Sequence, residues 1–175
     1  MATANTFVQI GSTVTVGSGG AATISFSSIP QTYTDLKVVM SARSTSASSE
    51  GVNLKINSIT TGYVSRFLVG NGASAGSGTR TALAGFDFSG VINYSTTTAN
   101  TFGNVEIYIP NYTSSNAKVA SSDSVQETNA ATAYMYLASH FQTSTEAITS
   151  LTCTVQDGSD FVQYTTASLY GILKY

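Results

Sequence analysis

Charged residues are scarce in this 175-residue chain: they make up 9% of it, against about 25% in an ordinary soluble domain. Seven basic and nine acidic side chains are spread along the sequence and give a net charge of −2. Because Lys and Arg form no run, the sequence argues against a surface for DNA or RNA. A hydroxyl-rich surface of low charge can be covered by neighbouring subunits at little desolvation cost, so the composition permits assembly.

Cysteine and tryptophan are also scarce. Cys153 is the single cysteine, which excludes an internal disulfide and a cysteine-based metal site. Its place in an alternating segment predicts a buried, unreactive thiol. Tryptophan is absent, which weighs against a dedicated carbohydrate-binding platform. No apolar run approaches a membrane span, and residues 1–5 lack a basic region followed by an apolar run, so we expect neither a membrane segment nor a secretory signal.

The residues that are abundant favour strands. Thr, Val, Ile, Tyr and Phe suit a pleated, half-buried surface, whereas the combination of Ala, Leu, Glu and Lys that helices favour is missing. A chain of this length fits one domain, and it contains no Pro-rich or charge-rich linker. We therefore predict a single β-sandwich domain over residues 1–175, in which residues 1–20 form an N-terminal arm or an edge strand.

Alternation of apolar and polar residues marks about ten short strands, separated by turns rich in Gly, Asn and Ser. The clearest strand runs from Tyr33 to Ser44, and the segment from Val105 to Ile109 repeats its pattern. The segment from Gly70 to Gly78 is predicted to be an exposed loop, because it is too rich in glycine to pack. This spacing predicts an all-β fold, an antiparallel β-sandwich that is jelly-roll-like because its loops are long and polar.

The segment from Ala130 to Phe141 is the one serious helix candidate, because it contains several good helix formers. Apolar Met135, Leu137 and Phe141 nevertheless alternate with Tyr134, Tyr136 and His140. A period of two is typical of a strand. We therefore predict a strand here.

The last thirty residues are predicted to complete the sheet. The pattern there predicts three short strands: Ala147 to Val155, a run with Phe161 and Tyr164, and Ser168 to Ile172. The turn Asp157-Gly158-Ser159-Asp160 favours a hairpin between the first two. A hairpin cannot bury its apolar face alone, so this unit needs further strands beside it. The residues predicted to lie in the core here are Leu151, Leu169 and Ile172.

Two patterns match a catalytic or metal site on paper. Residues Gly72 to Gly76 have the G-x-S-x-G spacing, but a nucleophile elbow needs a strand, a turn and a helix, and no helical pattern follows. The two aspartates of the closing turn could hold Ca²⁺, although turn chemistry explains them more simply. His140, the only candidate base, shares a face with Tyr134 and Tyr136, which favours a contact or packed-surface role. We predict no enzyme activity, no catalytic or metal site and no cofactor.

Tyrosine is frequent, with ten residues in the chain. Tyrosine rings could stack on glycans or lie in a subunit interface, where tyrosine is enriched. The sequence leaves both interpretations open. The tyrosines concerned are Tyr63, Tyr94, Tyr108, Tyr112, Tyr134 and Tyr136.

Three segments carry a family resemblance: Ser28 to Ser44, Ile107 to Tyr112, and Ala147 to Leu151 continuing through Phe161 to Ile172. Together they resemble small virion structural proteins of tailed bacteriophages, particularly phages of marine bacteria and cyanobacteria. Phe141 stands where a tryptophan is expected in such proteins. The resemblance implies a β-sandwich subunit that decorates a capsid or forms part of a tail fibre or other appendage, and that is assembled in the host cytoplasm.

From this resemblance we expect a non-enzymatic capsid decoration (cement) protein, a homotrimer bound to the major capsid protein or other virion proteins. Neither nucleic acid nor membrane is expected as a partner. The alternative is a tail-fibre or receptor-binding module that recognises a host surface glycan. A weaker third hypothesis is an enzyme that acts on polysaccharide through His140 or an acidic pair.

The N-terminal strand from Thr6 to Val16 is the first candidate for an interface, with an ordinary edge strand as the equal alternative. The side chains predicted to form interfaces are Phe7, Val8, Ile10, Val14, Val16, Tyr134, Tyr136 and His140.

Overall fold

The computed structural model describes residues 6–126, 128–129 and 133–173. These residues form twelve strands, paired antiparallel in two sheets. Within the described ranges, no helix is long and apolar enough to cross a membrane. The all-β prediction is therefore confirmed, with twelve strands rather than about ten.

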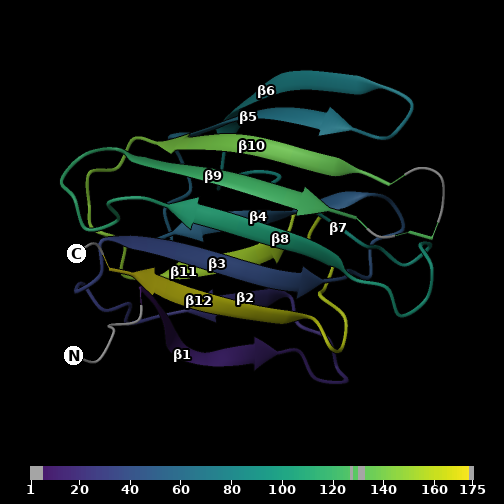
Figure 1. Ribbon diagram of the computed structural model, residues 1–175, viewed down its shortest axis with the longest axis horizontal. Coiled ribbons are helices and arrows are strands. Elements are labelled where there is room, and N and C mark those ends of the chain that lie inside the picture. Colours follow the sequence, from purple (N-terminus) through teal and green to yellow (C-terminus); the bar gives the residue numbers. More distant parts are fainter. Residues whose placement is uncertain (1–5, 127, 130–132, 174–175) are drawn as a thin grey trace.

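The strands of the large sheet are β1 (Phe7–Thr15), β3 (Asp35–Ala42), β5 (Tyr63–Gly70), β6 (Ala75–Leu83), β8 (Gly103–Ile109), β9 (Lys118–Val125), β10 (Met135–Gln142) and β12 (Thr166–Ile172). Their order is β1-β12-β3-β8-β9-β10-β5-β6, and Figure 1 shows them from β1 at the bottom to β6 at the top. The strands of the small sheet are β2 (Thr23–Phe26), β4 (Glu50–Ile56), β7 (Val91–Ile92) and β11 (Leu151–Val155), in the order β2-β11-β4-β7.

The two sheets enclose one main hydrophobic core, so the fold is a β-sandwich. On β3, alternation turns Leu36 and Val38 inward, where both are fully buried. On the small sheet, Leu54 and Cys153 lie opposite each other and contribute to the same core. Burial raises the pKa of the Cys153 thiol to about 12, which confirms the predicted buried thiol.

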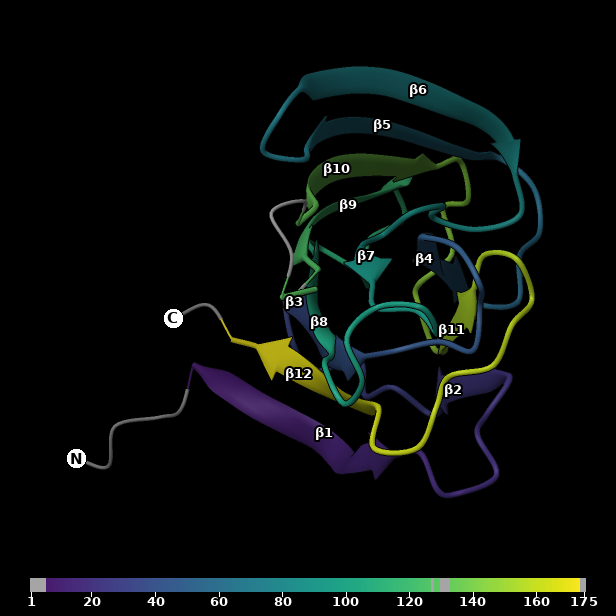
Figure 2. The ribbon, with the colours of Figure 1, turned by 90° about the vertical axis from the view of Figure 1, so that its right-hand side faces the viewer.

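The jelly-roll strand order stays a prediction. The sheets are unequal, with eight strands and four strands, and the consecutive strands β8, β9 and β10 lie side by side as a meander. Figure 2 shows that β10, β5 and β6 continue the large sheet at the top, beyond most of the small sheet. A smaller apolar cluster around Tyr136 and Ala138 fills the space beneath that end.

The closing segment is not a hairpin, and that prediction was wrong. The run from Phe161 to Tyr164 does not pair with β11, and Phe161 forms isolated bridges with Ala21 and Ser44 instead. β11 pairs with β2 and β4 in the small sheet, whereas β12 pairs with β1 and β3 in the large sheet. The turn chemistry reverses the chain, but it does not decide which sheet the next strand joins. Leu151 and Leu169 are buried as predicted. Ile172 is only half-buried, because β12 alternates and Gly171 takes the inward position.

The glycine-rich segment is partly a strand, contrary to the prediction of an exposed loop. β6 begins at Ala75 and pairs with β5 along its length. Gly78 lies opposite Phe67, and a Cβ atom at Gly78 would come within 2.6 Å of that ring. Glycine occurs in this strand because an aromatic ring covers its backbone.

The segment with helix-forming residues is a strand from Met135 onward, as its alternation predicted. Residues 130–132, where the helix-forming alanines begin, lie outside the described residues.

Candidate functional site

Strands β9 and β10 depart from the usual pattern of a sandwich, in which apolar side chains face the core. Both strands alternate strictly between buried and exposed positions, but polar residues occupy many of the buried ones. The buried polar side chains are Lys118, Ser122, Ser124, His140 and Gln142. The exposed positions are Val119, Ser121, Asp123, Val125, Met135, Leu137, Ser139 and Phe141.

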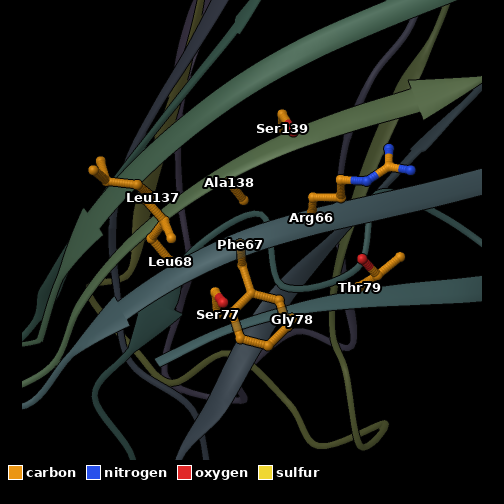
Figure 3. Close-up of a pocket in the computed structure, with 9 residues that line it drawn as sticks. All are labelled: Arg66, Phe67, Leu68, Ser77, Gly78, Thr79, Leu137, Ala138 and Ser139. Carbon is orange, nitrogen blue, oxygen red and sulfur yellow. The ribbon is translucent and has the colours of Figure 1, made fainter. Parts of the chain in front are cut away.

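Strand pairing places the exposed apolar side chains in rows across β9, β10 and β5, with one polar row of Ser121, Ser139 and Arg66 between them. Phe141 on β10 lies opposite Val119 on β9 and Val64 on β5, and Leu137 lies opposite Leu68 on β5. Figure 3 shows the side chains of Leu68 and Leu137 next to each other. We call this set the outer apolar face; its members are Val64, Leu68, Val119, Val125, Met135, Leu137 and Phe141.

The outer apolar face is exposed in this chain. Apart from the half-buried Val64, its side chains are between 40% and 59% exposed. Single exposed apolar residues are ordinary on protein surfaces, but several on one face of a sheet favour an interaction site. The chemistry that this arrangement supports is binding to another apolar surface.

A hollow of about 500 Å³ borders the outer apolar face where β10, β5 and β6 run side by side. Figure 3 shows its lining residues. The outward side chains on its walls are Arg66, Leu68, Ser77, Thr79, Leu137 and Ser139.

The inner face of the same strands holds a buried histidine between two serines. His140 Nδ1 lies 2.8 Å from the hydroxyl oxygen of Ser65 on β5, and His140 Nε2 lies 3.0 Å from that of Ser122 on β9. The ring packs at 5.1 Å from that of Phe86. Burial lowers the pKa of His140 to about 4, so the ring is neutral at pH 7. Since His140 is only 3% exposed, its hydrogen bonds serve to join strands.

A second buried polar contact lies nearby, where Arg80 Nη1 donates a hydrogen bond to Asp87 Oδ2 at 3.0 Å. The Arg80 guanidinium also lies 4.5 Å from the ring centre of Phe88. Burial raises the pKa of the Asp87 carboxyl, and the nearby Arg80 charge offsets part of that increase. These contacts attach the irregular segment after β6 to the interior.

The serine of the G-x-S-x-G segment holds the turn between β5 and β6. Asn71 Oδ1 accepts hydrogen bonds from the backbone N–H groups of Ala73 and Ser74 and from the Ser74 hydroxyl. Gly72 adopts a φ of 83°, which a turn of this kind needs. Ser74 is exposed on a hairpin turn and β6 follows it, so the strand–turn–helix of a nucleophile elbow is missing.

The aspartates of the closing turn fit turn chemistry. Asp157 accepts hydrogen bonds from the backbone N–H and the hydroxyl of Ser159. Burial by itself would raise the pKa of Asp157, but these bonds and one from Ser46 outweigh it and lower the pKa. Within the described residues, no group of three or more His, Cys, Asp or Glu side chains could hold a metal ion.

The predicted interface residues fall into different environments. On β1, Phe7 is exposed, Val8 is half-buried, and Ile10 and Val14 pack against the core. The pairing of β1 with β12 is irregular between Ile10 and Val14. Val16 is buried in the core. This strand lies at the edge of the large sheet, and its role in an interface stays a prediction.

The second group of predicted interface residues faces the wrong way for contact with a partner. Tyr136 and His140 are buried on the inner face, and only Tyr134 is half-exposed. The correction has a simple cause, because alternation separates two faces of a strand without telling which one is buried. The exposed side chains of β10 are instead Met135, Leu137 and Phe141. These three residues form the more apolar face of β10, so the pattern favours burying them and no signal within the strand identifies them as exposed.

The tyrosines also divide into buried and partly exposed residues. Tyr63, Tyr112 and Tyr136 are buried, so they cannot stack on a glycan. Tyr94 and Tyr134 are half-exposed and line a hollow of about 350 Å³ together with threonine side chains. Tyr108 is partly exposed on β8, and its hydroxyl donates a hydrogen bond to Asp35.

Comparison with protein-family models, with curated proteins and with solved structures finds no match to this chain.

Proposed function

We propose that this protein is a non-enzymatic structural protein of a tailed-phage particle, and specifically a capsid decoration protein that stabilises the head. The observation that carries the proposal is the outer apolar face. A protein that works alone gains nothing by leaving these side chains in water, whereas an assembling subunit buries them against its neighbour. The resemblance of residues 28–44 and 147–172 to virion structural proteins supplies the phage setting.

The polar groups of the chain support a structural task. His140 is held between two serines, and Ser74 is held in a turn by Asn71. Both groups therefore stabilise local structure where an enzyme would leave them open to a substrate. The scarcity of charge favours the same conclusion, since few charges must be desolvated when a neighbour covers the surface.

Immunogold labelling of purified virions tests the proposal. Label on the heads supports it, and label confined to the tails, or absent from virions, overturns it. A binding assay with heads that lack the protein then tests the face. We expect Phe141→Ser to lower head occupancy at least tenfold. Tyr164→Asn, which removes an aromatic ring that is 66% exposed outside that face, should leave occupancy unchanged.

A second function, recognition of a host surface glycan, is favoured by the hollow between Tyr94 and Tyr134. Its lining includes threonine hydroxyls and Gln126, whose buried Oε1 atom accepts no hydrogen bond from any residue that the structure describes. Aromatic rings beside hydrogen-bonding groups suit sugars, which have both apolar and hydroxyl faces. Binding of the protein to purified host polysaccharide tests this function. Tyr94→Ala should abolish that binding and Tyr108→Ala should preserve it; no binding by the wild-type protein would exclude the function.

A further inference from the structure

We propose that the outer apolar face binds the same face of a second copy of this chain, in a two-fold dimer in which Arg66 of each copy pairs with Asp123 of the other. The inference rests on the proposed function, because it makes a second copy the neighbour that covers the face. The head is then occupied by the dimer, so a change in the face lowers head occupancy by weakening the dimer. A two-fold dimer takes the place of the trimer expected from the sequence resemblance.

The face carries one cation and one anion that lack partners in their own chain. Arg66 on β5 and Asp123 on β9 are both exposed. Neither forms an ion pair or a side-chain hydrogen bond with any other described residue. Glu106 lies opposite Asp123 on β8, but its carboxylate already pairs with Lys37 at 2.5 Å. Two charges of opposite sign therefore remain available on an apolar face.

The strand register keeps these two charges apart within one chain. Asp123 lies opposite Leu137, and Arg66 lies opposite Ser139, with β10 between the two strands. Two strand spacings and an offset of two residues put the Cα atoms of Arg66 and Asp123 roughly 12 Å apart. The two side chains form no ion pair with each other, so water solvates both charges until a partner covers the face.

A second copy supplies that partner by symmetry. In a two-fold contact, when residue i of one copy touches residue j of the other, residue j also touches residue i. The two-fold axis lies in the plane of the face and crosses β10 between Leu137 and Ser139. It brings Arg66 of each copy against Asp123 of the other copy. Any other partner would need an anion and a cation at this same separation across apolar residues.

The apolar residues between the charges complete the match. Leu137 lies beside the axis and Leu68 is its neighbour, so the leucines of both copies meet at the centre of the contact. Burying them removes apolar area from water, and the two ion pairs at the sides fix the orientation. Because the charges of Arg66 and Asp123 cancel, the face carries no net charge that would repel the same face of a second copy.

Analytical ultracentrifugation of the purified full chain tests the dimer. The wild-type protein should sediment as a dimer, and Arg66→Asp and Asp123→Arg should each weaken the dimer at least tenfold, because each creates two like-charge contacts. A mixture of the two variants should recover an affinity within about threefold of wild type, since one copy then carries two acids and the other two bases. Lys55→Glu, a charge reversal on the small sheet, should leave the dimer affinity unchanged.

Recovery on mixing also shows that both variants fold. A wild-type monomer at all concentrations, a trimer, unchanged dimerisation in the reversals, or no recovery on mixing would each overturn the dimer. Virion labelling keeps this result separate from the proposed function. A monomer that labels phage heads overturns the dimer alone, and a dimer absent from virions overturns the structural role alone.

Discussion

His140 on β10 lies directly opposite Ser65 on β5, and the ring Nδ1 atom is 2.8 Å from the serine hydroxyl oxygen. With Ser122 on β9 bonded to the other ring nitrogen, one imidazole joins three neighbouring strands. This contact lies on the inner side of the same strands that present the outer apolar face. Because side chains alternate between the two faces of a strand, burying the polar face of β9 and β10 exposes their apolar face.

The stability of the protein is expected to depend on pH through His140. Burial lowers the pKa of the folded ring from 6.5 to about 4, so the unfolded chain takes up the proton first as the pH falls. The stabilising effect of the neutral ring is complete above pH 6.5 and is lost as the pH falls toward 4. The loss should reach about 2–3 kcal/mol of unfolding free energy by pH 4.5.

Urea unfolding at pH 7 and pH 4.5 checks this prediction when wild type is compared with His140→Gln. Glutamine can still bond a serine hydroxyl but does not titrate, so the variant should lose much less stability over this interval. Asp157 has a lowered pKa, and its effect appears only below about pH 4. An equal loss in both proteins would show that another group titrates.

Truncation of Leu169 should be far more costly than truncation of Ile172. Both residues are on β12, but Leu169 is fully buried between the sheets and Ile172 is half-buried on the outer side. We expect Leu169→Ala to lower the free energy of unfolding by about 2–5 kcal/mol and Ile172→Ala by about 1 kcal/mol. Chemical denaturation of both variants measures this difference, and similar costs would place the two side chains in equivalent surroundings.

Gly171 is expected to tolerate no side chain while Tyr33 is present. A Cβ atom at Gly171 would overlap the ring of Tyr33, which packs against the inner side of β12. Gly171→Ala should therefore cost about 1–3 kcal/mol. In a Tyr33→Ala background the same change should be close to neutral. Thermal denaturation of the four proteins of this double-mutant cycle gives the coupling, and additive effects would mean that the two residues do not touch.

The turn between β5 and β6 should depend on Asn71 rather than on Ser74. Asn71 Oδ1 accepts three hydrogen bonds, whereas the Ser74 hydroxyl donates one of them. Asn71→Ala should increase amide hydrogen exchange in β6 about fivefold, because a turn bond is worth roughly 1 kcal/mol. Ser74→Ala should have a smaller effect. Exchange by mass spectrometry measures both, and the reverse order would contradict the assigned roles.

Much of the fold follows from local patterns in the sequence. The alternation of β3 and β8 predicts their faces correctly, because apolar residues recur there at every second position and most of the residues between them are polar. The segment ending at Phe141 is a strand for the same reason, although it contains helix formers. These predictions succeed where local preference and tertiary environment agree.

Other features depend on contacts between distant residues. The closing turn predicts a reversal at Asp157, but the following strand, β12, pairs with β1 and β3 of the other sheet. The glycine-rich segment becomes a strand because Phe67 on β5 covers Gly78. Neither contact leaves a signal within the segment itself, so local patterns cannot reveal it.

The candidate site shows the same limit. By itself, the sequence determined an all-β chain of low charge, with a strand at β10 that has two chemically distinct faces. Only the tertiary structure decided which face is inside, because the period of two is the same for either choice. The polar face of β10 can be buried because Ser65 and Ser122 satisfy the ring of His140, and this leaves Leu137 and Phe141 outside, available to a partner.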